Sequence, residues 1–256
     1  MKLKKVTKLG LGICAFALAS TLFVKGNVKA DITEGVPLKV GKHVKATLSK
    51  TGVLTISGKG EMWEDVDDTA EYYNKWFNNK KSDIYKIVIK DGVTSIGRRA
   101  FYQLESVQSV SIPKSVKSIE AHAFRMTKAL RKVKIPNSVK NIGVQAFYES
   151  GIAKCTFGKN VREIDNFAFA HCNNLRSVSI PSNVKEVGQG AFLESGVSKV
   201  KIGRKDAFPV VKATIYSKKV LIGENAFAEG SVLKAYKGSS ADEYAKLNDL
   251  YIRYIK

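Results

Sequence analysis

A short pattern recurs along this chain at a nearly constant interval. Six times an Ala-Phe pair follows an Ile or Val by four residues, with the Ala at positions 100, 123, 146, 168, 191 and 226. The intervals are 23, 23, 22, 23 and 35 residues, so the last equals one repeat plus an insertion of about a dozen residues. Self-similarity at a fixed period of this length is typical of repeat proteins, and it predicts a solenoid.

Residues 115–136 show how one repeat is expected to fold. Ile119 belongs to a short extended piece, Phe124 begins a segment with the spacing of a helical turn, and Val133 lies in a second strand. That strand ends at Pro136, which cannot donate a ladder hydrogen bond. One unit cannot bury its apolar stripe alone, so stacked copies about 4.8 Å apart must join their stripes into a common core. The side chains expected to form an aromatic stack in that core are Phe101, Phe124, Phe147, Phe169, Phe192 and Phe227.

Some repeats have one residue fewer between the Phe and the second strand. Gly151 and Gly196 end the turn segment in two of these copies. Because glycine readily adopts the left-handed conformation, both positions predict a tight, left-handed exit from the turn.

The first 30 residues have the features of a signal peptide. Residues 1–8 carry four Lys and no acid, residues 9–24 form an apolar run, and Val28 and Ala30 stand where a signal peptidase reads the chain. The alternative is an uncleaved membrane anchor, but this run of sixteen residues falls short of the roughly 20 that a spanning helix needs. We expect cleavage after Ala30, which removes six Lys and lowers the formal charge from +20 to +14.

Both ends of the predicted solenoid carry segments that suit caps. Alternating apolar residues on either side of Gly52 predict a β-hairpin within residues 44–56. Ser240 with Glu243 has the pattern of a capping box and predicts a helix over residues 241–247, followed by a strand-like end. The predicted organisation is a signal peptide at 1–30, a hairpin and aromatic cap at 31–83, about six repeats at 84–230 with an insertion near 206–217, and a C-terminal cap at 231–256.

The repeated string of Ile-Pro, Val, Ile-Gly and Ala-Phe resembles a known repeat family. Read across residues 112–135 and again across 161–181, it is similar to the BspA-like leucine-rich repeat, also called the Treponema pallidum type. The resemblance covers about residues 84–256. It implies a leucine-rich repeat solenoid of short strands and short helical turns, with a hairpin before the repeats and a helix and strand after them. It also implies a bacterial protein that is secreted or displayed at the surface, and some members bind host matrix or other cells, although a fold does not fix a ligand.

The chain is strongly basic and lacks the usual catalytic patterns. Lys and Arg number 43 against 23 Asp and Glu, so a polyanion is a suitable partner. A Gly-rich phosphate loop, a nucleotide fingerprint, a Ser-His-Asp order and a Cys-x-x-Cys spacing do not occur in the sequence. We therefore expect no enzyme activity, no cofactor, no metal and no specific nucleic-acid partner.

The histidines and cysteines are expected to have structural roles. His43, His122 and His171 are scattered, and the repeat phase places the last two in coils that are not adjacent. Cys155 and Cys172 occupy phases that hold apolar residues in other repeats, so both are predicted to be small core side chains. A disulfide between these two cysteines is the alternative in an exported chain.

Residues 61–71 concentrate carboxylates, and aromatic residues crowd the same stretch. The segment lacks the Gly and the twelfth-position Glu of a calcium loop, so a solvated loop is expected. Trp63 and Phe77 are among the aromatic residues, which we expect to close the N-terminal end of the core. An aromatic platform for a ligand is the alternative.

Two sets of cations recur at fixed phases of the repeat and would form ladders about 5 Å apart on stacked coils. Like charges at that spacing oppose folding by a few tenths of a kcal/mol per neighbour pair, so stability does not account for them. Glu163 and Glu186 relieve part of the second ladder, and a basic face with no ligand is the alternative. The first set, on the outward positions of the second strand, is Lys132, Lys134, Lys154, Lys199 and Lys201. The second set, after the inward Val of the first strand, is Lys117, Lys140, Arg162 and Lys185.

These features predict a secreted binding protein without enzyme activity. The predicted function is that of an adhesin, in which the basic solenoid face recognises a host matrix protein or an acidic glycan. The alternative is a structural cell-envelope protein that anionic wall polymers retain by charge. We expect no transmembrane segment or covalent attachment after signal cleavage.

Overall fold

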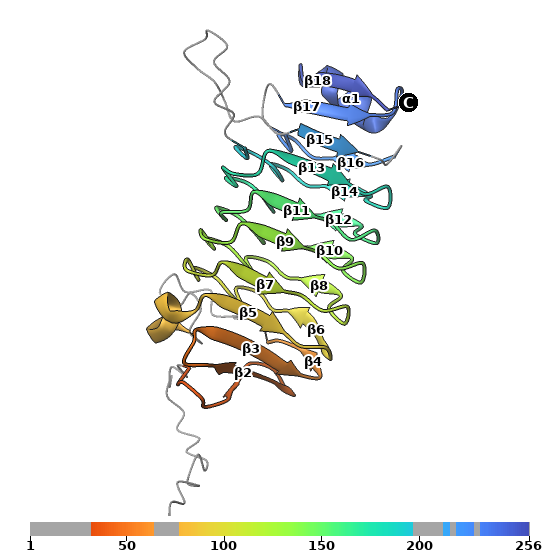
Figure 1. Ribbon diagram of the computed structural model, residues 1–256. Coiled ribbons are helices and arrows are strands. Elements are labelled where there is room, and N and C mark those ends of the chain that lie inside the picture. Colours follow the sequence, from red (N-terminus) through yellow and green to blue (C-terminus); the bar gives the residue numbers. More distant parts are fainter. Residues whose placement is uncertain (1–31, 64–76, 197–211, 216–218, 228–230, 256) are drawn as a thin grey trace, which may run out of the picture.

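The computed structural model describes residues 32–63, 77–196, 212–215, 219–227 and 231–255. The chain winds as a stack of coils whose short strands lie in two columns (Figure 1). Strands at the same phase of successive repeats pair in parallel, which confirms the predicted repeat solenoid. The predicted signal peptide lies outside the described residues.

The strands of one column form three sheets in succession. The five-stranded sheet runs in the order β1 (Leu38–Lys39), β2 (Val44–Leu48), β3 (Val53–Gly58), β5 (Lys86–Ile89) and β7 (Ser109–Ser111). The two-stranded sheet contains β9 (Lys132–Lys134) and β11 (Lys154–Thr156). The four-stranded sheet runs in the order β13 (Ser177–Ile180), β15 (Lys212–Ile215), β17 (Val232–Ala235) and β18 (Tyr251–Tyr254).

The other column is a single sheet of seven very short strands. Ile119, Ile142 and Ile164 occupy equivalent positions in three of them and are 1%, 0% and 0% exposed. Because a β-branched residue recurs at this phase of the repeat, each coil places the same kind of side chain over its neighbour. In order, the strands are β4 (Gly60–Glu61), β6 (Val93–Ile96), β8 (Ser118–Ile119), β10 (Asn141–Ile142), β12 (Glu163–Ile164), β14 (Glu186–Val187) and β16 (Leu221–Ile222).

The segments predicted as helical turns are series of tight turns instead. His122 and Met126 have φ values of 59° and 61°, a left-handed conformation that a right-handed helix does not contain. The N–H of Phe124 donates to the C=O of Ala146 in the next coil at 2.7 Å, whereas the N–H of Arg125 donates to His122 in its own coil at 3.1 Å. Alternate N–H groups thus join neighbouring coils. A helix would use these groups for its own ladder.

The predicted aromatic stack is present in the core. Neighbouring rings in the column from Phe101 to Phe227 have centroids 5.0 to 5.4 Å apart. Phe77, which comes just before the 3-10 helix η1 (Asn78–Asp83), extends the stack at a centroid distance of 6.4 Å from Phe101. The ring of Tyr244 meets Phe227 edge-on at the other end. The core is therefore continuous along the described coils.

The two ends of the described chain contain a hairpin and a helix. Strands β2 and β3 pair in antiparallel fashion, and helix α1 (Ser240–Leu247) precedes β18. The N-cap is Ser239, one residue before the predicted Ser240: its hydroxyl accepts from the N–H of Asp242, and the Asp242 carboxylate accepts from the N–H of Gly238 at 2.8 Å. Ser239 and Ser240 are each followed by an acidic residue three positions later, so the sequence pattern fits either serine as the N-cap. No helix within the described ranges has the length and apolar character needed to cross a bilayer.

The long interval between the last two Ala-Phe pairs contains its strand at a different position from the predicted one. Strand β13 pairs with β15, in which Lys212 lies opposite Ser177. Residues 212–215, predicted to belong to an insertion, therefore supply the strand that was assigned to Lys199 and Lys201. Both segments alternate polar and apolar residues, so spacing alone could not choose between them. Lys199 and Lys201 lie outside the described residues, and the domain boundaries remain predictions.

Candidate binding groove

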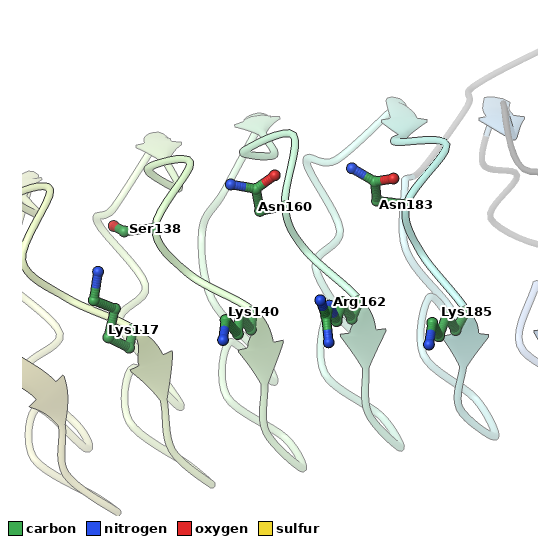
Figure 2. Close-up of a pocket in the computed structure, with 7 residues that line it drawn as sticks. All are labelled: Lys117, Ser138, Lys140, Asn160, Arg162, Asn183 and Lys185. Carbon is green, nitrogen blue, oxygen red and sulfur yellow. The ribbon is translucent and has the colours of Figure 1, made fainter.

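Four of the predicted cations line one open groove on the seven-stranded side of the solenoid. The groove has a volume of about 490 Å³. Figure 2 shows its charged side chains in one row, with a row of shorter polar side chains beside them. The cations are Lys117, Lys140, Arg162 and Lys185, and the polar residues are Ser138, Asn160 and Asn183.

A ladder of backbone hydrogen bonds aligns the four cations. The N–H of Lys140 donates to the C=O of Lys117 at 2.8 Å, that of Arg162 to Lys140 at 2.7 Å, and that of Lys185 to Arg162 at 2.7 Å. Each cation follows a buried Val, which fixes its side chain on the outside of the coil. The ladder ends at Thr94 on one side and Leu221 on the other, since these residues make the next bonds of the series. The repeat phase therefore produces a row of four charges.

The charges of this row are not neutralised within the described part of the chain. All four cations are exposed, none forms an ion pair with a described residue, and the lining of the groove contains no carboxylate. Glu163, predicted to relieve the ladder, instead accepts a hydrogen bond from Asn141 at 2.7 Å and lies opposite Glu186 in the sheet. Neighbouring coils are about 4.8 Å apart, less than the Debye length of about 8 Å at physiological salt. The cations therefore repel one another.

The polar row supplies hydrogen-bonding groups next to the charges. The Ser138 hydroxyl is buried and has no hydrogen-bond partner, and the Asn160 amide makes none with the described residues. The Asn183 amide donates to the C=O of Lys159 at 2.8 Å. In the preceding coil, Ser115 occupies the same phase but donates to the C=O of Val93 and does not line the groove. The groove thus combines cations with unpaired polar atoms.

This polar row was not predicted, although the sequence contains a signal for it. Ser138, Asn160 and Asn183 each stand two residues before a ladder cation. A polar residue that recurs at a fixed distance from a cation must lie beside it on every coil. The prediction considered only the charged residues and therefore did not include these three polar residues.

The described cations of the first set, Lys132, Lys134 and Lys154, lie on the opposite column of strands. Lys154 of β11 is directly opposite Lys132 of β9, and Lys134 is opposite Thr156. The sheet contains only these two strands, so no longer ladder forms here among the described residues. Among the described residues, the structure therefore separates the predicted site residues into two groups, of which only the second set lines the groove.

The histidines and cysteines lie away from the groove. The two cysteines are free and buried, and the Cys172 thiol donates to the C=O of Phe147 at 3.1 Å. Nδ1 of His171 lies 3.0 Å from the Glu194 carboxylate. Burial, followed by the charges of Arg125 and two further arginines, lowers the pKa of His122 to about 4. Among the residues that the structure describes, no three His, Cys, Asp or Glu side chains are grouped to hold a metal.

The repeats match a known protein family. Residues 94–219 match the family described as BspA type leucine rich repeat region, in six copies. A comparison with curated proteins finds no significant match.

Several solved structures of bacterial repeat proteins resemble this fold. A leucine-rich repeat protein from Eubacterium ventriosum has a TM-score of 0.48 and 19% identity, over 80% of this chain and 67% of that one. The pneumococcal vaccine antigen PcpA has a TM-score of 0.42 and 16% identity, over 75% of this chain and 67% of its own. The T. pallidum leucine-rich repeat protein has a TM-score of 0.34 and 18% identity, over 75% of this chain and 84% of its own.

Proposed function

Because the repeats of this chain belong to the BspA-type leucine-rich repeat family, we propose that the protein acts by binding and that the groove holds an extended acidic glycan of the host matrix. The observation that supports this proposal is the row of four exposed cations in a groove without a carboxylate. A glycan of this kind carries sulfate or carboxylate groups along a linear chain. Each anion that binds neutralises a cation which the fold holds against repulsion.

The dimensions of the row favour a linear ligand over a compact one. Four coils separated by about 4.8 Å spread their charges over about 15 Å, parallel to the solenoid axis. The Arg162 guanidinium can bind a sulfate or carboxylate through two hydrogen bonds, and the lysines act as point charges. The exposed Asn160 amide is free to bond oxygen atoms next to the anions. Binding of this kind weakens steeply as salt increases.

The proposal requires the protein to act outside the cell. The basic start and apolar run of residues 1–30 support export. An anionic wall polymer is the other ligand that a row of cations could hold, and it would retain the protein on the cell that made it. Both sources of negative charge must therefore be tested.

Heparin retention with two charge-matched variants tests the groove. The groove variant replaces Lys117, Lys140, Arg162 and Lys185 by Ser. The control variant replaces Lys86, Lys132, Lys134 and Lys154 by Ser, which removes the same charge from exposed positions on the other column of strands. We expect the groove variant to elute from heparin at a clearly lower salt concentration than the control. Equal elution of the two variants would show that net charge, and not the groove, binds the polyanion.

Cell fractionation separates the two sources of polyanion. If the glycan proposal is correct, the native protein is found in the medium and binds wells coated with heparan sulfate, and the groove variant does not. If the protein instead remains with the cells until salt releases it, and the groove variant is not retained, the ligand is the wall polymer and the matrix proposal is wrong.

A further inference from the structure

A second hollow lies at the N-terminal end of the same seven-stranded sheet. It has a volume of about 610 Å³ and opens beside β4, the strand at the end of this sheet (Figure 1). Sites for small molecules commonly enclose about 300 to 1,000 Å³. Unlike the groove, it contains an exposed aromatic ring and two carboxylates. Its chemistry is therefore different from that of the cation ladder.

The aromatic ring is that of Trp63, whose side chain is 43% exposed. Its backbone is held firmly, because the N–H of Trp63 donates to the C=O of Val40 at 2.8 Å. On the other side, a Cβ at Gly97 would lie only 2.2 Å from the Trp63 carbonyl oxygen, so the first repeat approaches this backbone as closely as a glycine allows. The Lys39 amino group lies 5.3 Å from the ring centroid and is not part of the hollow. The indole is thus a supported, half-exposed platform.

Donors and acceptors surround this platform in balance. Glu61 and Glu120 supply carboxylate acceptors, and Lys42 and Lys59 supply ammonium donors. A register shift between Gly60 and Glu61 changes the direction of the chain at this point. Ser95 is only 7% exposed, and its hydroxyl, which can donate and accept, makes no hydrogen bond with the described residues. The lining therefore suits a ligand with many hydroxyl groups.

We propose that this hollow binds a pyranose ring of an uncharged oligosaccharide. The C–H face of a sugar ring is apolar and can lie against the indole, and its hydroxyls can reach both carboxylates and amines. Because Glu61 and Glu120 offset the charges of Lys42 and Lys59, the lining offers an anionic ligand no net attraction. A wholly apolar ligand would leave the polar lining desolvated without partners. The site is independent of the cation ladder, so it does not rest on the proposed function of the groove.

Ligand-observed NMR at high salt tests the proposal. The probes are cellotriose, maltotriose and triacetylchitotriose at about 5 mM, a concentration that reveals weak binding. The buffer contains about 1 M NaCl, where a Debye length of about 3 Å suppresses binding by the ladder. We expect saturation transfer to at least one trisaccharide. The Trp63 indole N–H resonance should shift on titration, and a Trp63→Phe variant assigns it among the two tryptophans of the chain.

Variants then locate the binding. Trp63→Ala should weaken the affinity roughly tenfold, because the ring contact is lost. Tyr251→Ala removes another exposed aromatic residue, one that lies outside the hollow, and should not change the affinity. Glu61→Ala, at an exposed position, provides a second variant that loses an acceptor and keeps the aromatic platform. The proposal is overturned if no probe shows transfer, if the indole resonance does not move, or if Trp63→Ala binds as well as the wild type.

Discussion

The rings of Phe147 and Phe169 lie 5.0 Å apart and within 9° of parallel. Both side chains are fully buried, and each belongs to a different coil. A coil that loses its ring would therefore leave an empty layer between two neighbours. The stack joins the coils into a single cooperative core.

Phe147→Ala should destabilise the protein by about 3 to 5 kcal/mol, because it removes a large buried side chain and leaves a cavity. The loss should appear in equilibrium urea unfolding as a lower midpoint. Since each repeat contacts its neighbours, hydrogen exchange should become faster in the coils on both sides of the substitution as well.

Leu247→Ala is the control for this substitution. It also shortens an apolar side chain, but Leu247 is 84% exposed, so the midpoint should hardly change. Equal midpoints for Phe147→Ala and the wild type would mean that the ring stack does not stabilise the solenoid.

The sequence was sufficient for the repeat architecture because one phase decides the role of each residue. Phe124 is buried in the stack as expected, and Cys172 is a core residue like Leu104 at the same phase. The backbone between these positions was harder to predict. Nothing in the pattern reveals that His122 adopts a left-handed conformation, because that choice depends on hydrogen bonds to the next coil.

The backbone conformation of Gly151 was also not predicted correctly. Gly196 has the predicted positive φ of 78°, but Gly151 is not in the left-handed region. A Cβ at Gly151 would lie 1.9 Å from the carbonyl oxygen of Lys128 in the preceding coil. The position does require a glycine, as predicted. The reason is the close approach of the neighbouring coil and not a left-handed backbone.

The candidate site was predictable in part. The alignment of Lys140 with Arg162 follows from the repeat length, and the backbone ladder has that register. The hollow at Trp63 could not be derived, because it depends on how the hairpin packs against the first coil. Contacts such as that of Trp63 with Val40 arise outside the repeat phase.

The two buried cysteines should be unreactive in the folded protein. Burial raises the pKa of Cys172 to about 12 and raises that of Cys155 well above its usual value. The thiolate is the reactive form, so a thiol reagent at about pH 8 should not label the folded protein when it is produced without residues 1–30. After denaturation, both cysteines should react. Labelling of fewer than two thiols in denaturant would indicate the disulfide, and rapid labelling of the native protein would contradict their burial.

The cation ladder should make stability depend on salt. Replacing Lys117, Lys140, Arg162 and Lys185 by Ser removes three neighbouring repulsions, each of a few tenths of a kcal/mol. At low salt the variant should therefore be more stable than the wild type by up to about 1 kcal/mol. At about 1 M NaCl the difference should disappear. Urea midpoints at both salt concentrations measure this effect, and a less stable variant at low salt would show that the side-chain stems contribute packing.

His122 should link stability to pH. Its ring is half-buried beside Arg125, Arg99 and Arg98, and burial is the largest cause of a folded-state pKa of about 4. The unfolded chain has the ordinary value of about 6.5. Between these values the unfolded state binds a proton that the folded state does not, so stability should fall as the pH decreases from about 6.5 to about 4.

An NMR titration of the imidazole checks the first half of this argument, and its midpoint should lie near 4. His122→Gln checks the second half, because it removes the proton uptake. At about pH 8, where the ring is neutral in both states, the comparison of variant and wild type gives the packing effect alone. The free energy of unfolding of the variant minus that of the wild type should be more favourable to the variant at about pH 4.5 than at about pH 8. The same difference at both pH values would mean that His122 titrates alike in the folded and unfolded chains, so that neither burial nor the three arginines lower its pKa.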